Sequence, residues 1–252
     1  MPFGESSLAN ASAAGDLEEV KSLLSKAHNL SERDKHDALR IAVENDDLTL
    51  VDCLLANNTK PTTFDFAKAV EQCSYPILEL LLSSGFDINT PLREDYPPPL
   101  AFAVFDPELV QWLIAHGANP NARCKFDITP LSIAAKSASK EVIELLFKLG
   151  ASTEYGQPLH FAVEKDRPDE IITLLLEKGA PINGIMYEGH KFSYHHWKDF
   201  GLGTPLHEAA RVGNKRLVQL LQKCGANPNI RDTLGELPQL KNTTRGDSNW
   251  KQ

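Results

Sequence analysis

Short amphipathic segments recur along the chain in pairs. In the stretch TPLHEAARVGNKRLVQLLQKCGANPN, which begins at Thr204, apolar residues recur at helical spacing in both halves, and Gly225 follows the second half. Residues at this spacing fall on one face of a helix, so the pattern predicts two short helices joined by a turn. Thr-Pro favours the start of the first helix, and the glycine favours the end of the second. The pattern predicts an all-α fold built from helix–turn–helix units.

The same unit occurs at several places. It is clearest in the segments PPLAFAVFDPELVQWLIAHGANPN, TPLSIAAKSASKEVIELLFKLGAS and PLHFAVEKDRPDEIITLLLEKGAPIN, which begin at Pro98, Thr129 and Pro158. Each unit has an alanine deep in its first predicted helix, where a small side chain allows a neighbouring helix to approach. These alanines are Ala103, Ala134, Ala162 and Ala209. Repetition of one supersecondary unit indicates a stacked-repeat architecture.

The unit resembles the ankyrin repeat, whose TPLH signature is present in full at residues 204–207. The resemblance predicts a solenoid of about seven helix–turn–helix repeats with hairpin fingers over residues 6–240. The predicted repeats begin near residues 6, 37, 64, 98, 129, 157 and 204. Residues 241–252 are polar and show no periodicity, so we expect them to form a disordered tail.

The resemblance also assigns a structural role to two histidines. In the ankyrin family the TPLH histidine hydrogen-bonds the threonine of its own motif and nearby backbone, which ties adjacent units together. His207 has Thr204 in the required position, whereas His160 has Gln157 there. We therefore expect both histidines to be structural, with the bonding of His160 left open.

One segment does not fit the repeat. The seventh predicted repeat starts at residue 204, later than a period of about 33 residues would place it. The excess is an insert, residues 184–203, which we expect to enlarge the finger between the last two repeats. It contains Tyr187, His190, Phe192, Tyr194, His195, His196, Trp197 and Phe200. Two interpretations are open: the rings contact a partner or ligand, or they fold back on the repeats and form a small core.

Composition narrows the possible partners and compartments. The net charge of −8 would repel phosphates and anionic lipid, so we expect neither nucleic acid nor membrane as a partner. No apolar run is long enough to span a bilayer, and the first residues lack a secretory signal. The four cysteines are scattered, as in a reducing compartment. We expect an intracellular monomer, cytoplasmic or nuclear.

The insert also invites a metal or an enzymatic interpretation. His195, His196 and Asp199 offer zinc-type ligands, but adjacent histidines do not converge easily on one ion, so we expect no metal and no cofactor. If the protein were an enzyme, His195 and His196 would exchange protons with Tyr194 or Asp199 as partner. No nucleophile elbow, phosphate loop or carboxylate pair accompanies them, so catalysis is not expected.

The resemblance implies binding through the fingers and the exposed side of the first helices, which line a concave groove. We expect a protein or peptide partner held across repeats four to seven, with the insert as a lid whose deletion would abolish binding and change thermal stability little. The expected contact residues are Tyr96, Phe105, Phe126, Asp127, Lys136, Tyr155, Tyr187, His190, Phe192, Tyr194, His195, His196, Trp197 and Arg211. Two alternatives stay open: a small-molecule or catalytic pocket closed by the insert and lined by His195, Tyr194 and Arg211, or a regulatory part of a larger assembly.

Overall fold

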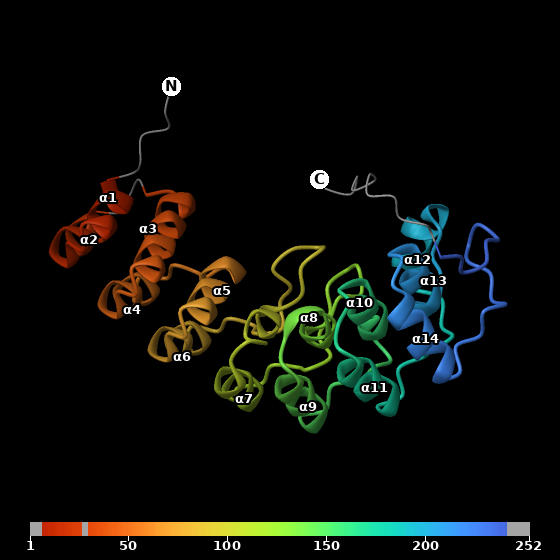
Figure 1. The fold of residues 1–252 in the computed structure, drawn as a ribbon. Helices are drawn as coiled ribbons and strands as arrows, with labels where there is room; N and C mark the ends of the chain where they lie inside the picture. The colour runs from red at the N-terminus through yellow and green to blue at the C-terminus, as the bar shows by residue number, and fades with distance from the viewer. Residues whose placement is uncertain (1–6, 27–29, 241–252) are drawn as a thin grey trace. The chain divides into compact units, whose positions relative to one another are not determined.

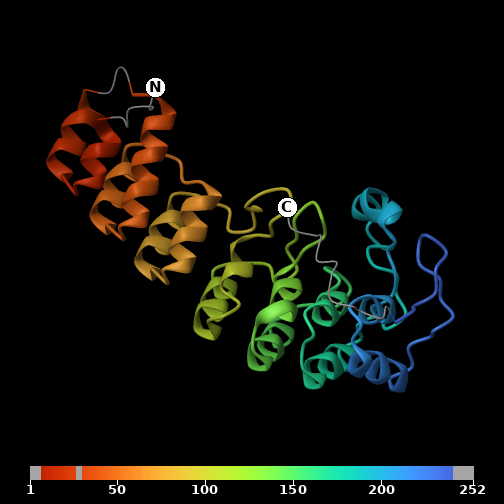
Figure 2. The same ribbon diagram turned by 45° about the horizontal axis from the view of Figure 1, so that its top comes forward.

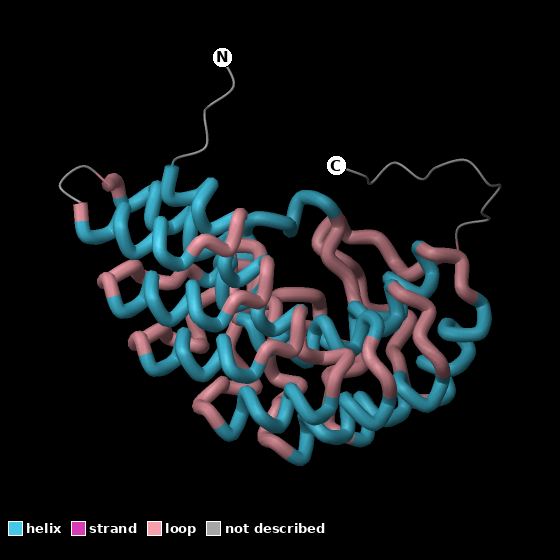
Figure 3. Tube along the Cα trace, turned by 90° about the vertical axis from the view of Figure 1, so that its left-hand side faces the viewer, coloured by secondary structure: helices cyan, strands magenta, loops and turns pink. Residues whose placement is uncertain are grey.

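The predicted all-α fold is confirmed by a computed structural model, which describes residues 7–26 and 30–240. Within these ranges the chain forms helices and loops and no strand (Figure 3). None of the described helices has the length and apolar character that a membrane span needs. The predicted tail, residues 241–252, and the predicted first residue of the array, residue 6, lie outside the described residues.

The helices follow one another in pairs, as the repeated pattern predicts. The pairs are α1 (Ser7–Ala13) with α2 (Leu17–Ser25), α3 (Glu32–Glu44) with α4 (Leu48–Ala56), α5 (Thr63–Glu71) with α6 (Tyr75–Ser83), the 3₁₀-helix η1 (Pro99–Phe102) with α7 (Pro107–Ala115), α8 (Pro130–Ser137) with α9 (Lys140–Lys148), α10 (Pro158–Glu164) with α11 (Asp169–Glu177), and α13 (Pro205–Arg211) with α14 (Lys215–Lys223). The insert adds α12 (Lys191–Trp197) and the 3₁₀-helix η2 (Lys198–Phe200) between the last two pairs.

The chain divides into two compact units. The first comprises Met1–Leu92 and Pro98–Asn119, and the second comprises Arg93–Pro97 and Pro120–Gln252. In the first unit α1, α3, α5 and η1 contact one another in order, and α2, α4 and α6 form a second row (Figure 1). In the second unit α8, α10 and α13 are successive neighbours in the same way. Each unit is thus a stack in which a helix pair packs against the pair next to it.

Side-chain caps explain why the helices begin where they do. Thr62, Thr129 and Thr204 each stand before a first helix in a capping box with the third residue of that helix. Several second helices are also capped by side chains. The N-cap residue Asp106, for example, accepts hydrogen bonds from two backbone N–H groups of α7. The motif alanines lie in the interior, and Ala134 of α8 is completely buried. Caps and small residues together give the short, closely packed pairs.

A repeated hydrogen bond links successive pairs of the second unit. The residue in the histidine position of each motif donates to a backbone oxygen in the segment that follows the second helix of the same pair. Ser132 Oγ donates to Gly156 O, His160 Nε2 to Gly203 O at 3.2 Å, and His207 Nε2 to Glu236 O at 3.2 Å. Thr204 also donates to His207 Nδ1 from its hydroxyl at 2.9 Å and from its N–H at 3.0 Å. The predicted bonding of His207 is confirmed, and His160 makes the same inter-pair bond without the threonine.

His160 makes the fold sensitive to acid. Burial lowers its pKa to about 4, although backbone hydrogen bonds with Gly203 and Gly184 act in the opposite direction. The ordinary pKa of histidine is about 6.5, so the unfolded chain takes up the proton first as the pH falls. The stabilisation is therefore complete above about pH 6.5 and is lost as the pH falls to about 4, a change of about 3 kcal/mol at most.

We expect His160→Gln, which can keep a donor for Gly203 O, to show a smaller fall in Tm between about pH 7 and about pH 4.5 than the wild type. His195→Gln is the control because His195 is exposed. Its Tm should fall as steeply as that of the wild type. If all three proteins had the same pH dependence, His160 would not be the group responsible.

Candidate functional site

The insert forms an ordered structure tied to the repeats at its base. Met186 N–H donates to Gly203 O at 2.9 Å, which brings the two ends of the insert together. Leu202 N–H donates to Thr233 Oγ1 at 2.8 Å, and Thr233 N–H donates back to Leu202 O at 2.9 Å. The insert is therefore held both at its own ends and to the loop that follows α14. In Figure 2, α12 stands apart from α13, and the two ends of the insert connect it to the repeats.

One side of the insert packs inward. Tyr187 and Leu202 form a small core with Phe161 of α10, and Ile185, Met186 and Tyr194 pack against it. Only 7% of Tyr187 is exposed, and burial raises the pKa of its hydroxyl. Tyr187 is thus an internal residue, and the expectation that it contacts a partner is not supported. On this side, rings of the insert fold back on the repeats and form a small core.

The other side of the insert carries exposed rings that pack against a loop of the repeats. The ring centroid of Phe126, in the loop before α8, lies 5.2 Å from that of Phe192, 5.2 Å from that of His196 and 6.2 Å from that of Trp197. The Trp197 centroid lies 5.7 Å from that of Phe200. Of these side chains Phe192 is 41% exposed, Trp197 36% and Phe200 62%. We call these five residues the aromatic surface.

Charged residues border the aromatic surface. The Lys125 ammonium lies 4.8 Å from the ring centroid of Phe192 and pairs with Glu94 at 2.9 Å. Glu94 belongs to the loop 93–97, in which the exposed ring of Tyr96 lies 5.0 Å beneath the Arg93 guanidinium. The loop that carries Lys125 therefore contacts both the insert and the loop 93–97. Apolar rings with a charged rim are the usual composition of a protein-binding patch.

Asp127 requires a correction. The sequence places it at an exposed finger tip, but only 2% of it is exposed. Its carboxylate accepts hydrogen bonds from Arg123 at 2.9 Å, from Gly156 N–H at 3.3 Å and from Gln157 Nε2 at 3.2 Å. These bonds join the loop before α8 to the loop before α10. Asp127 therefore has a structural role, because loss of its carboxylate would leave these three donors without their acceptor.

The other expected contact residues are spread more widely. Phe105 is exposed in the first unit, whereas the insert belongs to the second unit. Tyr155 is half-buried, with the Arg123 guanidinium 4.8 Å from its ring centroid. His190 caps α12, because its Nδ1 accepts from Ser193 N–H at 3.3 Å. His195 is exposed and its ring lies edge-on to Tyr194, with centroids 6.0 Å apart.

Three residues of the site are absent from the set expected from sequence. Phe200 is the most exposed ring of the aromatic surface, and its position in an aromatic insert is the signal that could have identified it. Lys125 and Glu94 offer no such signal, because their pairing depends on two loops that are separated in sequence.

A cavity of about 650 Å³ lies beside the insert in the second unit. Its walls include Phe200, Leu202, Leu234, Leu240 and Arg211. Because Phe200 belongs to both, the aromatic surface continues into this cavity. Arg211 lines this cavity, whereas Tyr194 and His195 do not. In the described ranges no three His, Cys, Asp or Glu side chains are placed to hold a metal ion.

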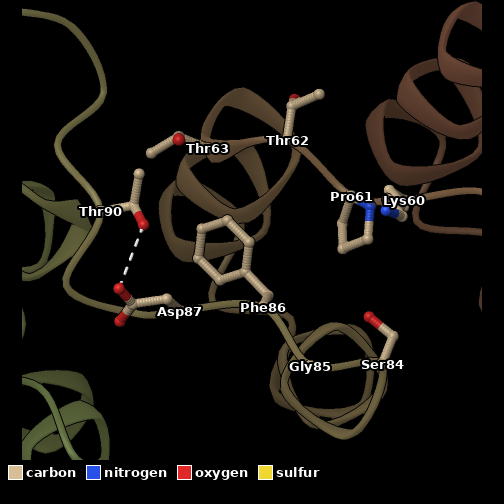
Figure 4. A pocket seen from close by; sticks show the side chains of 9 residues that line it. All are labelled: Lys60, Pro61, Thr62, Thr63, Ser84, Gly85, Phe86, Asp87 and Thr90. Carbon is tan, nitrogen blue, oxygen red and sulfur yellow. Dashed lines mark hydrogen bonds between the residues drawn. The ribbon is translucent and has the colours of Figure 1, made fainter.

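A smaller cavity of about 480 Å³ lies in the first unit, between the start of α5 and the end of α6 (Figure 4). Phe86 lies between these two helices and stacks on Phe66 with ring centroids 4.7 Å apart. The polar walls are largely engaged, since Thr62 bonds Asp65 and Thr90 bonds Asp87. It is therefore a poorer candidate than the aromatic surface.

Comparisons with known proteins identify the repeats. Residues 100–185 match a model of ankyrin repeats in three copies, and residues 203–233 match a model of the single ankyrin repeat. Ankyrin repeat protein nuc-2 of Neurospora crassa is 33% identical over 129 residues, which are 50% of this chain and 11% of that protein. Putative ankyrin repeat protein FPV018 of Fowlpox virus is 25% identical over 226 residues, 79% of this chain and 32% of that protein. The chain thus spans a third or less of these relatives.

Solved structures show the same fold. The human ASB11 ankyrin repeat domain superposes with a TM-score of 0.60 at 24% identity, covering 88% of this chain and 99% of that one. The ankyrin repeat domain of Bcl-3, described as a unique member of the IkappaB protein family, gives a TM-score of 0.56 at 24% identity over 79% of this chain and 91% of that one. Ankyrin-repeat domains are generally protein–protein interaction modules. The repeated motif, the stacked helix pairs and these matches agree that the chain is built from ankyrin repeats.

Proposed function

We propose that this chain binds a protein or peptide through the aromatic surface formed by Phe126 and the insert. The observation that carries the proposal is the exposure of three large rings, Phe192, Trp197 and Phe200, on a segment that is otherwise firmly held. Burying aromatic rings removes a large apolar area from water at a small loss of side-chain entropy. Because the base of the insert is packed and hydrogen-bonded, a partner would meet rings that are already in place.

The surroundings of the rings suit an interface. Lys125 with Glu94 and Arg93 with Asp95 supply the polar rim that commonly surrounds an apolar centre. The cavity beside Phe200 provides a recess that an apolar side chain of the partner can enter. In this proposal the insert is part of the contact surface through Phe192 and Trp197 of α12, and not only a lid over a groove.

The test is affinity capture from cell extract with the whole chain and two variants. The double variant Phe192→Ala/Trp197→Ala removes exposed rings of the aromatic surface. Phe64→Ala is the matched control, because Phe64 is 56% exposed in the first unit. We expect proteins that are retained by the wild type and by Phe64→Ala but lost by the double variant.

For a partner found in this way, calorimetry should give a Kd raised by about 30-fold or more for the double variant, as expected when a hot-spot side chain is truncated. The circular dichroism spectrum should stay unchanged, because both rings lie on the outer side of the insert. Equal capture by the double variant and the control would show that the aromatic surface is not the binding site.

A further inference from the structure

Lys136 is a half-buried cation without a carboxylate partner in the described part of the chain. It lies in the last turn of α8, and its ammonium is 4.0 Å from the ring centroid of Phe161 on α10. Two charged groups act on its pKa after burial: Glu164 raises it and Lys165 lowers it. The Glu164 carboxylate pairs with Lys165 at 2.7 Å, so it is already engaged.

The ring of Phe161 does not fully replace the water that the ammonium has lost. A cation above an aromatic face is attracted to it, but an ammonium has three N–H donors that the ring does not satisfy as a carboxylate would. Burial accordingly lowers the pKa of Lys136, which means that the charged form is disfavoured in the free protein. A carboxylate brought by a partner would restore the missing interaction.

Lys136 is well placed for such a partner. It stands on α8 at the same position after the N-cap residue as Glu164 on α10 and Arg211 on α13. Arg211 already forms an ion pair with the Glu208 carboxylate. Lys136 differs from Arg211 because it has no such ion pair within the described residues. Phe161, on which the ammonium rests, also packs against Tyr187 and Leu202 at the base of the insert. Phe161 thus connects Lys136 to the base of the insert that carries the aromatic surface.

We propose that Lys136 binds an aspartate or glutamate side chain of the protein or peptide that occupies the aromatic surface. This inference rests on the proposed function and makes it more specific. The partner segment would combine an apolar or aromatic residue, which contacts the insert, with an acidic residue at a fixed distance along its chain.

A displayed library of random peptides tests both ideas with the whole chain as bait. The baits are the wild type, Lys136→Met and Phe192→Ala/Trp197→Ala. We expect the wild type to enrich peptides with Asp or Glu at a fixed spacing from an apolar residue. Lys136→Met should enrich apolar peptides without that acidic preference. For a selected peptide, Lys136→Met should raise the Kd about 10-fold or more, and changing the peptide's Glu to Gln should abolish this difference between the two baits.

The outcomes separate the two ideas. Peptides that need the aromatic surface but show no acidic preference would overturn the role of Lys136 and leave the proposed function standing. Acidic peptides that need Lys136 but bind the double variant normally would overturn the proposed function and leave the lysine site standing. An unchanged acidic preference with Lys136→Met would overturn the inference.

A second measurement requires no ligand. Lys136→Met removes the desolvated charge and leaves a flexible apolar chain against Phe161. We expect its Tm to equal or exceed that of the wild type, by up to about 3 °C. A clear fall in Tm would mean that the ammonium is already satisfied within the protein, and the inference would be wrong.

Discussion

Gly156→Ala is expected to lower the free energy of unfolding by about 4 kcal/mol. Gly156 has φ +77°, a conformation that a side chain disfavours, and an added Cβ would lie 2.2 Å from Ser132 Oγ and 2.4 Å from Thr129 Oγ1. The first effect costs about 1 kcal/mol, and forcing an extra carbon into packed surroundings costs about 3 kcal/mol. Neither hydroxyl can move away freely, because the two bond each other and Ser132 also donates to Gly156 O.

Urea denaturation of Gly156→Ala and Gly235→Ala checks this expectation. Gly235 has φ +84°, but an added Cβ there would meet no atom within 4 Å. The control should therefore lose only the backbone contribution of about 1 kcal/mol. Equal losses in the two variants would contradict the steric part of the argument and would leave the backbone strain as the whole effect.

Tyr187→Ala is expected to destabilise the chain by about 3 kcal/mol, because it empties the core between the insert and α10. Trp197→Ala, on the outer side of the same insert, should change stability by less than about 1 kcal/mol. Thermal unfolding of the two variants checks the difference. If both lost the same amount, the insert would not have an inner and an outer side in solution.

The same core argues against deleting the whole insert to test binding. Deletion of residues 184–203 would remove Tyr187 and Leu202 from the core and take away Gly203 O, the acceptor of His160. We now expect such a deletion to lower stability substantially, so a loss of binding could simply follow from unfolding. Substitution of the outer rings avoids this ambiguity.

Much of the fold is predictable from sequence because the repeat gives several independent observations of one unit. The alanine positions, the helix pairs and the bond between Thr204 and His207 all follow from the motif. The exception is η1, which has only one turn of 3₁₀-helix where other pairs have an α-helix. Fewer residues lie between Pro99 and Asp106, the N-cap of α7, than between Pro130 and Ser139, the N-cap of α9, so this pair has less chain for its first helix.

The site is less predictable, because the insert has no second copy with which to compare it. Tyr187 and Trp197 are both aromatic, and only the packing of Phe161 decides that one turns inward and the other outward. Asp127 looks like a solvated loop residue until the donors of Arg123 and Gln157 are seen around it. In both cases one deciding neighbour, Phe161 or Gln157, is distant in sequence.

The attachment of the insert has a consequence for how this array can change during evolution. Repeat arrays gain or lose units readily when each unit touches only its neighbours, because a duplication then creates the same junction again. Here the insert packs on Phe161 before α13 and bonds Thr233 after α14, so it bridges the last helix pair. Duplicating or exchanging that pair alone would separate the insert from one of its two supports. We therefore expect the segment from the loop before α8, which carries Phe126, to the loop after α14 to be inherited as a block.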